Sequence, residues 1–328
     1  MSIDYQKCAS FLFIFSFLLV FSCSTDSDLN QQDPDKAAQL DTTDDTTDEM
    51  TDDNTDGSTD DNTDGSTDDN TDDANSNCEN LIWSEEFEGT SLDESKWSYQ
   101  RGGWSGASNV QNCYVDNNTS VSGGTLKITA KYEPGYDCFK NERDFTSGFI
   151  QTKDRVFWTY GYFEARVKVP ASDSTWPAFW LSPQDHVYGE WPRSGEIDVF
   201  EIKGNDLNYA RGNAHWGNST SDRRQKVGTY KLQGQDASDW HIYAVEWTLG
   251  KLNFYIDGEY YHTIDDFKAP NATTHPGPFN IPFYIRLNMA VGGNYLPEPH
   301  NDANNNLDQL PATMEVDYVR VYSEKPGC

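Results

Sequence analysis

Positive charge is scarce in this sequence of 328 residues. Lysine and arginine number 24 against 54 aspartate and glutamate residues, which gives a formal net charge of −30 at pH 7. Nucleic acids and anionic lipid surfaces repel so acidic a chain at long range, so neither is an expected partner. A neutral polysaccharide carries no such penalty. A strongly sulfated one would need a local basic patch, and 223–226 is the obvious candidate, although a solvated loop is the simpler interpretation.

A long helical period is also missing. Short runs that alternate apolar and polar residues, such as 125–130, 162–169 and 241–247, are separated by glycine, asparagine and proline. This is the pattern of an all-β protein. Asp257-Gly258 lies between two such runs and predicts a two-residue hairpin turn. Many strands without helices predict a β-sandwich, formed by a single domain over residues 78–328.

Apolar and basic residues are nearly absent from 24–77. An octapeptide repeat runs through this segment, first at Thr51–Ser58 and again at Thr59–Ser66. High charge without apolar surface cannot form a core, so residues 23–77 are predicted to be a disordered acidic tether rich in Thr, Asp and Asn. A calcium-binding loop is the alternative, but Thr63 stands where an EF-hand loop has its bidentate glutamate.

Long hydrophobic runs are limited to the N-terminus. Residues 1–22 hold a lysine and an apolar run, Phe11–Phe21, that is too short to span a bilayer comfortably, which is typical of a signal peptide. The following Cys23 completes a sequence that resembles a bacterial lipobox, so we expect it to be lipidated. An ordinary secretory signal is the alternative. The acidic residues that follow resemble the export tract of surface-exposed lipoproteins, which implies an outer-membrane anchor and exposure at the cell surface.

Cysteines are few. One lies in the predicted signal peptide and one at the lipobox, which leaves four cysteines with three possible pairings. We expect Cys78–Cys328, because the two ends of a compact domain often lie close together, and Cys113–Cys138 then follows. Zinc is not expected, because no Cys-x-x-Cys spacing is present.

Three carboxylates are interleaved with large apolar residues in 195–201, which predicts a strand. Glu196 and Asp198 share one face because side chains alternate along a strand, whereas Glu201 should point to the other face. A β-bulge around Val199-Phe200 would add one residue and bring all three acids to one face, and bulges are common beside active sites. We therefore predict a bulge and a cluster of three acids.

Clustered carboxylates repel each other unless they share a proton or bind a cation, so this cluster indicates either chemistry or a metal. A retaining glycosidase needs such an arrangement, with two carboxyl groups about 5–5.5 Å apart that act as nucleophile and acid/base. A third acid can help to separate their pKa values. A solvated edge strand and a divalent-metal site are the alternatives.

Seven motifs extend over residues 80–323 and leave the first 78 residues outside. They are Trp83–Phe87, Tyr160–Arg166, Trp176–Leu181, Trp191–Glu201, Ala214–Gly217, Leu287–Asn294 and Val316–Tyr322. Together they resemble the catalytic core of glycoside hydrolase family 16, especially its laminarinase (endo-β-1,3-glucanase) branch. The resemblance implies a jelly roll whose concave sheet carries the substrate cleft, and it makes residues 78–328 the catalytic domain.

The resemblance implies a role for each acid. Glu196 matches the nucleophile, Glu201 the acid/base, and Asp198 the residue that orients the nucleophile. Glu201 then needs a raised pKa in order to hold its proton, while Glu196 must stay ionised. Two displacements through a glycosyl-enzyme would retain the anomeric configuration, and no cofactor is needed for catalysis.

Substrate-binding residues are implied in the same way. Sugar rings present C–H faces that pack on indoles, so a polysaccharide groove is expected to be lined by tryptophans. His215 is expected beside the acid/base, and Asn109 and Arg166 are expected to hydrogen-bond sugars, although 108–112 departs from the family's usual Asn-Asn-Glu-Leu-Gln. The expected set is Asn109, Arg166, Trp176, Trp180, Trp191, His215, Trp216 and Asn288.

The family often holds a structural calcium on its convex side. Glu86, Gly124 and Asp317 match its ligands, and oxygen donors of this kind are those that calcium prefers. A polar position on an outward strand face is an equally simple interpretation of Asp317.

These observations predict a monomeric, exported, endo-acting retaining hydrolase of β-1,3-glucan, with mixed-linkage β-1,3-1,4-glucan as a second substrate. An agarase, porphyranase or carrageenase is the alternative within the same class of enzyme. From another class, the alternative is a surface lipoprotein that binds glycan without cutting it. The presence of all three acids argues against that alternative.

Overall fold

The computed structural model describes residues 80–103, 108–268 and 276–327. The predicted signal peptide, Cys23, the acidic tether and the predicted Cys78–Cys328 bond lie outside these residues. Helix within them is limited to three short 3₁₀ segments, which are η1 (Asp116–Asn118), η2 (Thr220–Asp222) and η3 (Ala303–Gln309). In the part of the chain that the structure describes, no helix is long and apolar enough to cross a membrane.

Eight strands form a curved sheet, here called the inner sheet, in the order β13-β12-β11-β10-β18-β8-β2, with β14 beside β12. All of its strand pairs are antiparallel. The strands are β2 (Ser98–Tyr99), β8 (Phe149–Gln151), β10 (Thr175–Pro183), β11 (Glu196–Ile202), β12 (Tyr209–Gly217), β13 (Arg223–Gln225), β14 (Gly228–Lys231) and β18 (Phe283–Val291).

Eleven strands form the second sheet, here called the outer sheet, in the order β17-β16-β15-β9-β19-β6-β7-β4-β3, with β1 beside β19 and β5 beside β6. The strands are β1 (Leu81–Glu85), β3 (Gly102–Gly103), β4 (Asn112–Tyr114), β5 (Thr119–Ser122), β6 (Thr125–Cys138), β7 (Asn141–Ser147), β9 (Gly161–Lys168), β15 (His241–Thr248), β16 (Lys251–Ile256), β17 (Glu259–Ile264) and β19 (Ala312–Tyr322).

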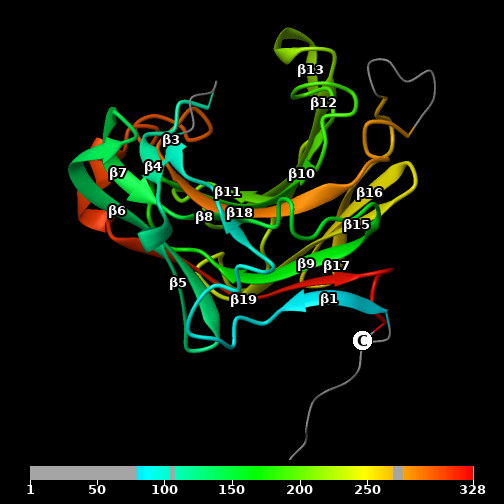
Figure 1. Ribbon diagram of the computed structural model, residues 1–328, viewed down its shortest axis with the longest axis horizontal. Coiled ribbons are helices and arrows are strands. Elements are labelled where there is room, and N and C mark those ends of the chain that lie inside the picture. The colour runs from blue at the N-terminus through cyan, green and yellow to red at the C-terminus, as the bar shows by residue number, and fades with distance from the viewer. Residues whose placement is uncertain (1–79, 104–107, 269–275, 328) are drawn as a thin grey trace, which may run out of the picture. The chain divides into compact units, whose positions relative to one another are not determined.

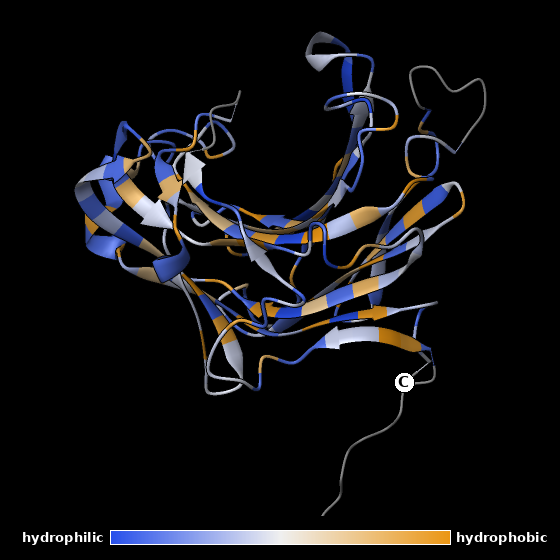
Figure 2. Cartoon of the chain, in the orientation of Figure 1, coloured by the Kyte–Doolittle hydropathy of each residue, from blue (hydrophilic) through white to orange (hydrophobic). Residues whose placement is uncertain are grey.

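The two sheets are stacked, and β12 and β13 rise at one side of the curved inner sheet (Figure 1). Apolar and polar residues alternate along many strands (Figure 2), so each sheet can turn an apolar face toward the other. Phe200 and Phe283 from the inner sheet and Phe163 and Phe254 from the outer sheet belong to one core and have no exposed surface. Burial of each such ring contributes about 1.5–3 kcal/mol. The predicted all-β sandwich is confirmed.

Two local predictions are also confirmed. Asp257 and Gly258 join β16 to β17 with φ angles of 51° and 80°, which is the left-handed backbone that a two-residue hairpin turn requires. Cys113 on β4 and Cys138 at the end of β6 form a disulfide.

Candidate active site

Strand β11 contains the predicted bulge. Against β10, Asp198 pairs with Trp180 and Phe200 with Phe179, so Val199 is an extra residue. The register with β12 shifts in the same place, between Asp198 and Glu201. Val199 and Phe200 are both buried in the core, which leaves the acids free to share the opposite face. The bulge therefore brings Glu196, Asp198 and Glu201 into one cleft.

The cleft has a volume of about 800 Å³ and is lined by β10, β11, β12 and β18 of the inner sheet. Additional lining comes from residues before β4, from the segment between β10 and β11, from the β12–β13 region and from the loop after β18. All nine residues of β18 are buried, because one face of this strand meets the core and the other lies under the cleft.

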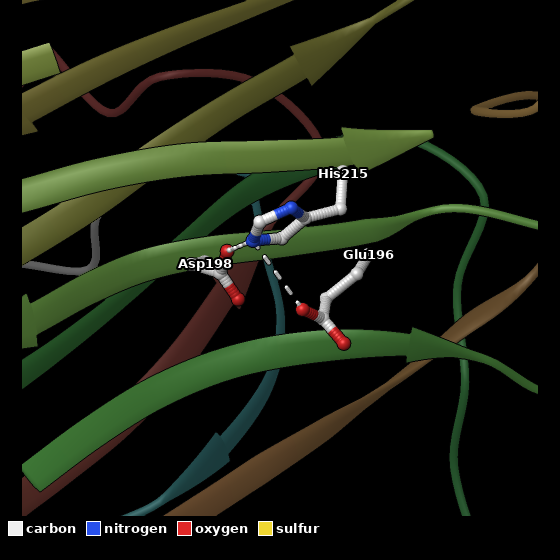
Figure 3. A group of neighbouring side chains, drawn as sticks. All are labelled: Glu196, Asp198 and His215. Carbon is white, nitrogen blue, oxygen red and sulfur yellow. Dashed lines mark ion pairs between the residues drawn. The ribbon is translucent and has the colours of Figure 1, made fainter. Parts of the chain in front are cut away.

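His215 on β12 lies beside two of the acids (Figure 3). Its Nε2 is 3.3 Å from Asp198 Oδ2 and 3.7 Å from Glu196 Oε1. Asn213, two residues earlier on the same face, places its Nδ2 2.9 Å from the same ring nitrogen. The resemblance implied a position beside Glu201, but the direct contacts of His215 are with the other two acids.

The cleft favours the protonated form of each acid. Burial, followed by the charge of Asp198, raises the pKa of Glu196 to about 7, while His215 and Arg286 oppose the shift. Burial raises the pKa of Asp198 to about 8, and Arg223 opposes it. Burial and the charge of Asp198 raise the pKa of Glu201 to about 8. Both glutamates therefore keep their protons to a higher pH than a solvated glutamate does.

Trp176 donates a hydrogen bond from Nε1 to Glu201 Oε1 at 3.1 Å, and its ring stacks on Tyr295 at 4.6 Å between centroids. Trp180 donates from Nε1 to Asn288 Oδ1 at 2.7 Å. Trp191 has 36% of its surface exposed. All of these residues line the cleft, as does His215, so the structure brings together five of the eight predicted substrate-binding residues.

The structure does not bring the other three predicted substrate-binding residues into this cleft. Trp216 follows His215 on β12, so strand alternation turns it into the core, where its ring packs against Phe267. Arg166 is on β9 of the outer sheet, where it pairs with Asp317 at 2.7 Å. Asn109 adopts a left-handed φ of 52°, and its two neighbours line the cleft while Asn109 itself does not.

Several cleft residues were missing from the sequence prediction. Arg211 alternates with Asn213 and His215 on β12, and Arg286 precedes Asn288 by two positions on β18. The two-residue period of a strand would have indicated both arginines. Tyr295 lies in the loop after β18, so no periodic signal pointed to it. Arg223 begins β13, and the sequence had indicated it only as part of the basic segment 223–226.

The carboxylates among the predicted calcium ligands form ion pairs with arginines instead. Glu86 accepts two hydrogen bonds from Arg320, at 2.9 and 2.8 Å. Asp317 is paired with Arg166, and Gly124 lies in the turn between β5 and β6. A guanidinium on each carboxylate opposes a divalent cation, so this arrangement does not fit a calcium site. Glu196, Asp198 and His215, by contrast, place one ligand atom each within 4.8 Å of one another and could hold a metal ion.

A sandwich whose concave sheet gathers three carboxyl groups in a tryptophan-lined cleft defines a class of protein, the polysaccharide-cleaving β-sandwich glycosidases. Residues 79–324 match the family model described as "Beta-porphyranase A-D, GH16 domain". The chain belongs to glycoside hydrolase family 16.

Several of its relatives are glucanases by name, and one is a keratan-sulfate endo-1,4-beta-galactosidase. A glucan endo-1,3-beta-glucosidase A1 of Niallia circulans is 37% identical and covers 75% of this chain, but the match spans only 38% of that protein's length. A beta-glucanase of Rhodothermus marinus is 34% identical over 74% of this chain and 84% of its own length. The solved laminarinase of Rhodothermus marinus superposes with a TM-score of 0.65 at 33% identity, over 75% of this chain and 98% of that one.

Proposed function

We propose that the protein is a retaining endo-β-1,3-glucanase that cleaves laminarin-type glucan and also accepts mixed-linkage β-1,3-1,4-glucan. The observation that carries this proposal is the bulge at Val199, which gathers three acids in one tryptophan-lined cleft. The names of the curated relatives support the choice of glucan. A glycan-binding protein without activity would have no use for three carboxyl groups clustered in its cleft.

In the proposed mechanism Glu201 gives its proton to the glycosidic oxygen while the Glu196 carboxylate attacks the anomeric carbon, so that the leaving chain departs as an alcohol. Glu201, now ionised, then takes a proton from water, which displaces Glu196 from the glycosyl-enzyme. The raised pKa of Glu201 supports its role as acid. Asp198 lies between the two on the same face and would orient Glu196.

Release of reducing ends from a polysaccharide panel tests the proposal. We expect cleavage of laminarin first and of lichenan second, with oligosaccharides of intermediate length from the start, as endo-action predicts. Agarose, porphyran and carrageenan complete the panel. Cleavage of a galactan without cleavage of laminarin would contradict the proposal.

A sulfated galactan is the second candidate substrate. The observation that favours it is the match of residues 79–324 to a family model named for β-porphyranases. The same panel decides between the two candidates, because porphyran and laminarin differ in both sugar and charge.

We also propose a cellular arrangement on the basis of the sequence. Residues 1–22 would direct export, Cys23 would carry the lipid, and 23–77 would hold the catalytic domain, 78–328, away from the outer membrane at the cell surface. The enzyme would act as a monomer on polysaccharide. Labelling of the intact protein with a radioactive fatty acid, and its loss in Cys23→Ser, tests the anchor.

A further inference from the structure

We infer that the cleft contains a subsite for an anionic substituent on the sugar chain, such as a sulfate ester or a carboxylate, and that Arg223 binds it. The inference rests on the proposed function, because it assumes that the cleft binds a polysaccharide. It goes further by assigning a charge to part of that polysaccharide.

The charge of the cleft differs from that of the whole chain. Acidic residues outnumber basic ones by more than two to one in the sequence. Among the described residues that line the cleft, by contrast, Glu196, Asp198 and Glu201 account for all the carboxylates, and three arginines accompany them. These arginines are Arg211, Arg223 and Arg286. The three arginines thus match the three acids in number, and an arginine that lies away from the acids can favour an anionic ligand locally.

Two of the three arginines already make contacts with other residues of the protein. Arg211 donates from Nη2 to Asp206 Oδ2 at 3.0 Å, so its charge is largely matched. Arg286 is 7% exposed, with its guanidinium 4.0 Å from the centre of the Trp180 ring and its Nη1 3.2 Å from Ser182 Oγ. Both are held in place by the protein itself.

Arg223 is different. It is the first residue of β13, it is exposed, and its guanidinium lies 5.7 Å from the centre of the Trp191 ring. Among the described residues it has no carboxylate within ion-pair distance, whereas Lys226 nearby is paired with Asp266. A sugar that packs against the exposed indole of Trp191 would place its substituents next to the guanidinium. The planar N–H donors of arginine match the oxygens of a sulfate or a carboxylate.

A counterion role is the competing explanation, because the charge of Arg223 also lowers the pKa of Asp198. The two explanations differ in what they predict. A counterion would alter the pH profile on any substrate equally, whereas an anion subsite would alter the choice between charged and neutral forms of one polysaccharide.

The experiment compares laminarin with two derivatives of the same backbone, one sulfated and one oxidised to a carboxylate at C6. Affinities are measured by calorimetry in the Glu196→Ser background of the exported chain, so that the ligand is not consumed. We expect Arg223→Gln to reduce the ratio of anionic to neutral affinity about tenfold, since one charge-assisted contact is lost. Arg223→Lys should restore part of the ratio, and the derivative that is more affected identifies the substituent.

Arg224→Gln is the matched control, because Arg224 is exposed, neighbours Arg223 on β13 and does not line the cleft. It should leave the ratio within about twofold, as expected for a charge screened by solvent. Equal effects of the two substitutions, an unchanged ratio in Arg223→Gln, or a change confined to the pH profile on neutral laminarin would each overturn the inference. Failure of the proposed function would be seen separately, as absence of laminarin cleavage by the unsubstituted enzyme.

Discussion

Two carboxyl groups of one strand have different partners in this cleft. Glu201 accepts a hydrogen bond from Trp176, whereas Glu196 faces His215 and feels the charge of Arg286. His215 opposes the rise in the pKa of both glutamates, and Arg286 opposes it for Glu196. The charge of Arg286 thus favours the ionised form of Glu196, which is the form that a nucleophile needs.

Substitution of either group should therefore stop hydrolysis for a different reason. Glu196→Ser removes the nucleophile and should abolish measurable turnover of laminarin. Glu201→Gln keeps the shape but has no acidic proton, and should lower kcat by about 10²–10⁴-fold. Neither should lower the melting temperature by more than a few degrees, because relief of charge repulsion offsets the lost contacts. Turnover and thermal unfolding of the purified variants provide the measurements.

Glu190→Gln is the control for these two substitutions. The Glu190 side chain is 90% exposed and lies in the segment that precedes β11. Its loss should leave turnover within about twofold of the parent, since an exposed acid contributes little. Wild-type turnover in Glu196→Ser, or an inactive Glu190→Gln, would show that the acids have been assigned wrongly.

The raised pKa values also predict how stability depends on pH. In the folded protein Asp198 and Glu201 titrate at about 8, whereas in the unfolded chain such groups titrate at about 4. Between these values the folded state binds more protons than the unfolded state, so stability decreases as pH rises. Asp198→Asn removes one of these groups.

We expect the melting temperature of the parent to fall between pH 5 and pH 8, and to fall less in Asp198→Asn. Calorimetric unfolding at the two pH values measures the difference. Asp185→Asn serves as the control, because Asp185 is exposed and should leave the pH dependence unchanged. A decrease of the same size in the parent and in Asp198→Asn would contradict the electrostatic account of the cleft.

At the level of elements, the bulge in β11 decides the chemistry. In a regular strand Glu201 would face away from Glu196, and the pair could not flank one bond. With Val199 added, the two carboxyl groups are expected to converge to about 5–5.5 Å, the separation that direct nucleophilic attack requires. A wider separation would leave room for water and would favour inversion.

Hydrolysis should consequently retain the β-anomer. Proton NMR of the anomeric region in the first minutes of laminarin cleavage measures the product before mutarotation mixes the anomers. A first-formed β-anomer is the expected outcome. A first-formed α-anomer would be incompatible with both the bulge geometry and the glycosyl-enzyme intermediate.

The elements also explain what could be predicted from the sequence. The bulge could be predicted because the acids can act together only if they share one face of the strand. The hairpin at Asp257 could be predicted because Asp-Gly is specific for a two-residue turn. Strand period alone would have turned Trp216 inward once His215 was placed in the cleft. Arg166 was different, because its place depends on β9 pairing with β15 and β19 of the outer sheet. Such long-range strand pairing cannot be inferred from the local sequence pattern around Arg166.

At the level of the whole molecule, composition divides the chain more sharply than any motif. The core of the described residues combines aromatic and branched apolar side chains from both sheets, and residues 24–77 contain few side chains of either kind. Segments that cannot bury apolar surface contribute little to the stability of a neighbouring fold.

Deletion of 24–77 from a soluble, unlipidated form should therefore leave the melting temperature within about 2 °C and kcat/KM on soluble laminarin within about twofold, because surface changes that touch no core are worth little. Both forms should be measured with calcium and with a chelator.

A calcium-dependent increase in melting temperature that disappears on deletion would show that the octapeptide repeats bind the ion and are structural. An increase that persists after deletion would place the ion in the catalytic domain, and would require Glu86 and Asp317 to exchange their arginine partners for a metal. With both carboxylates held by guanidinium groups, we expect neither increase.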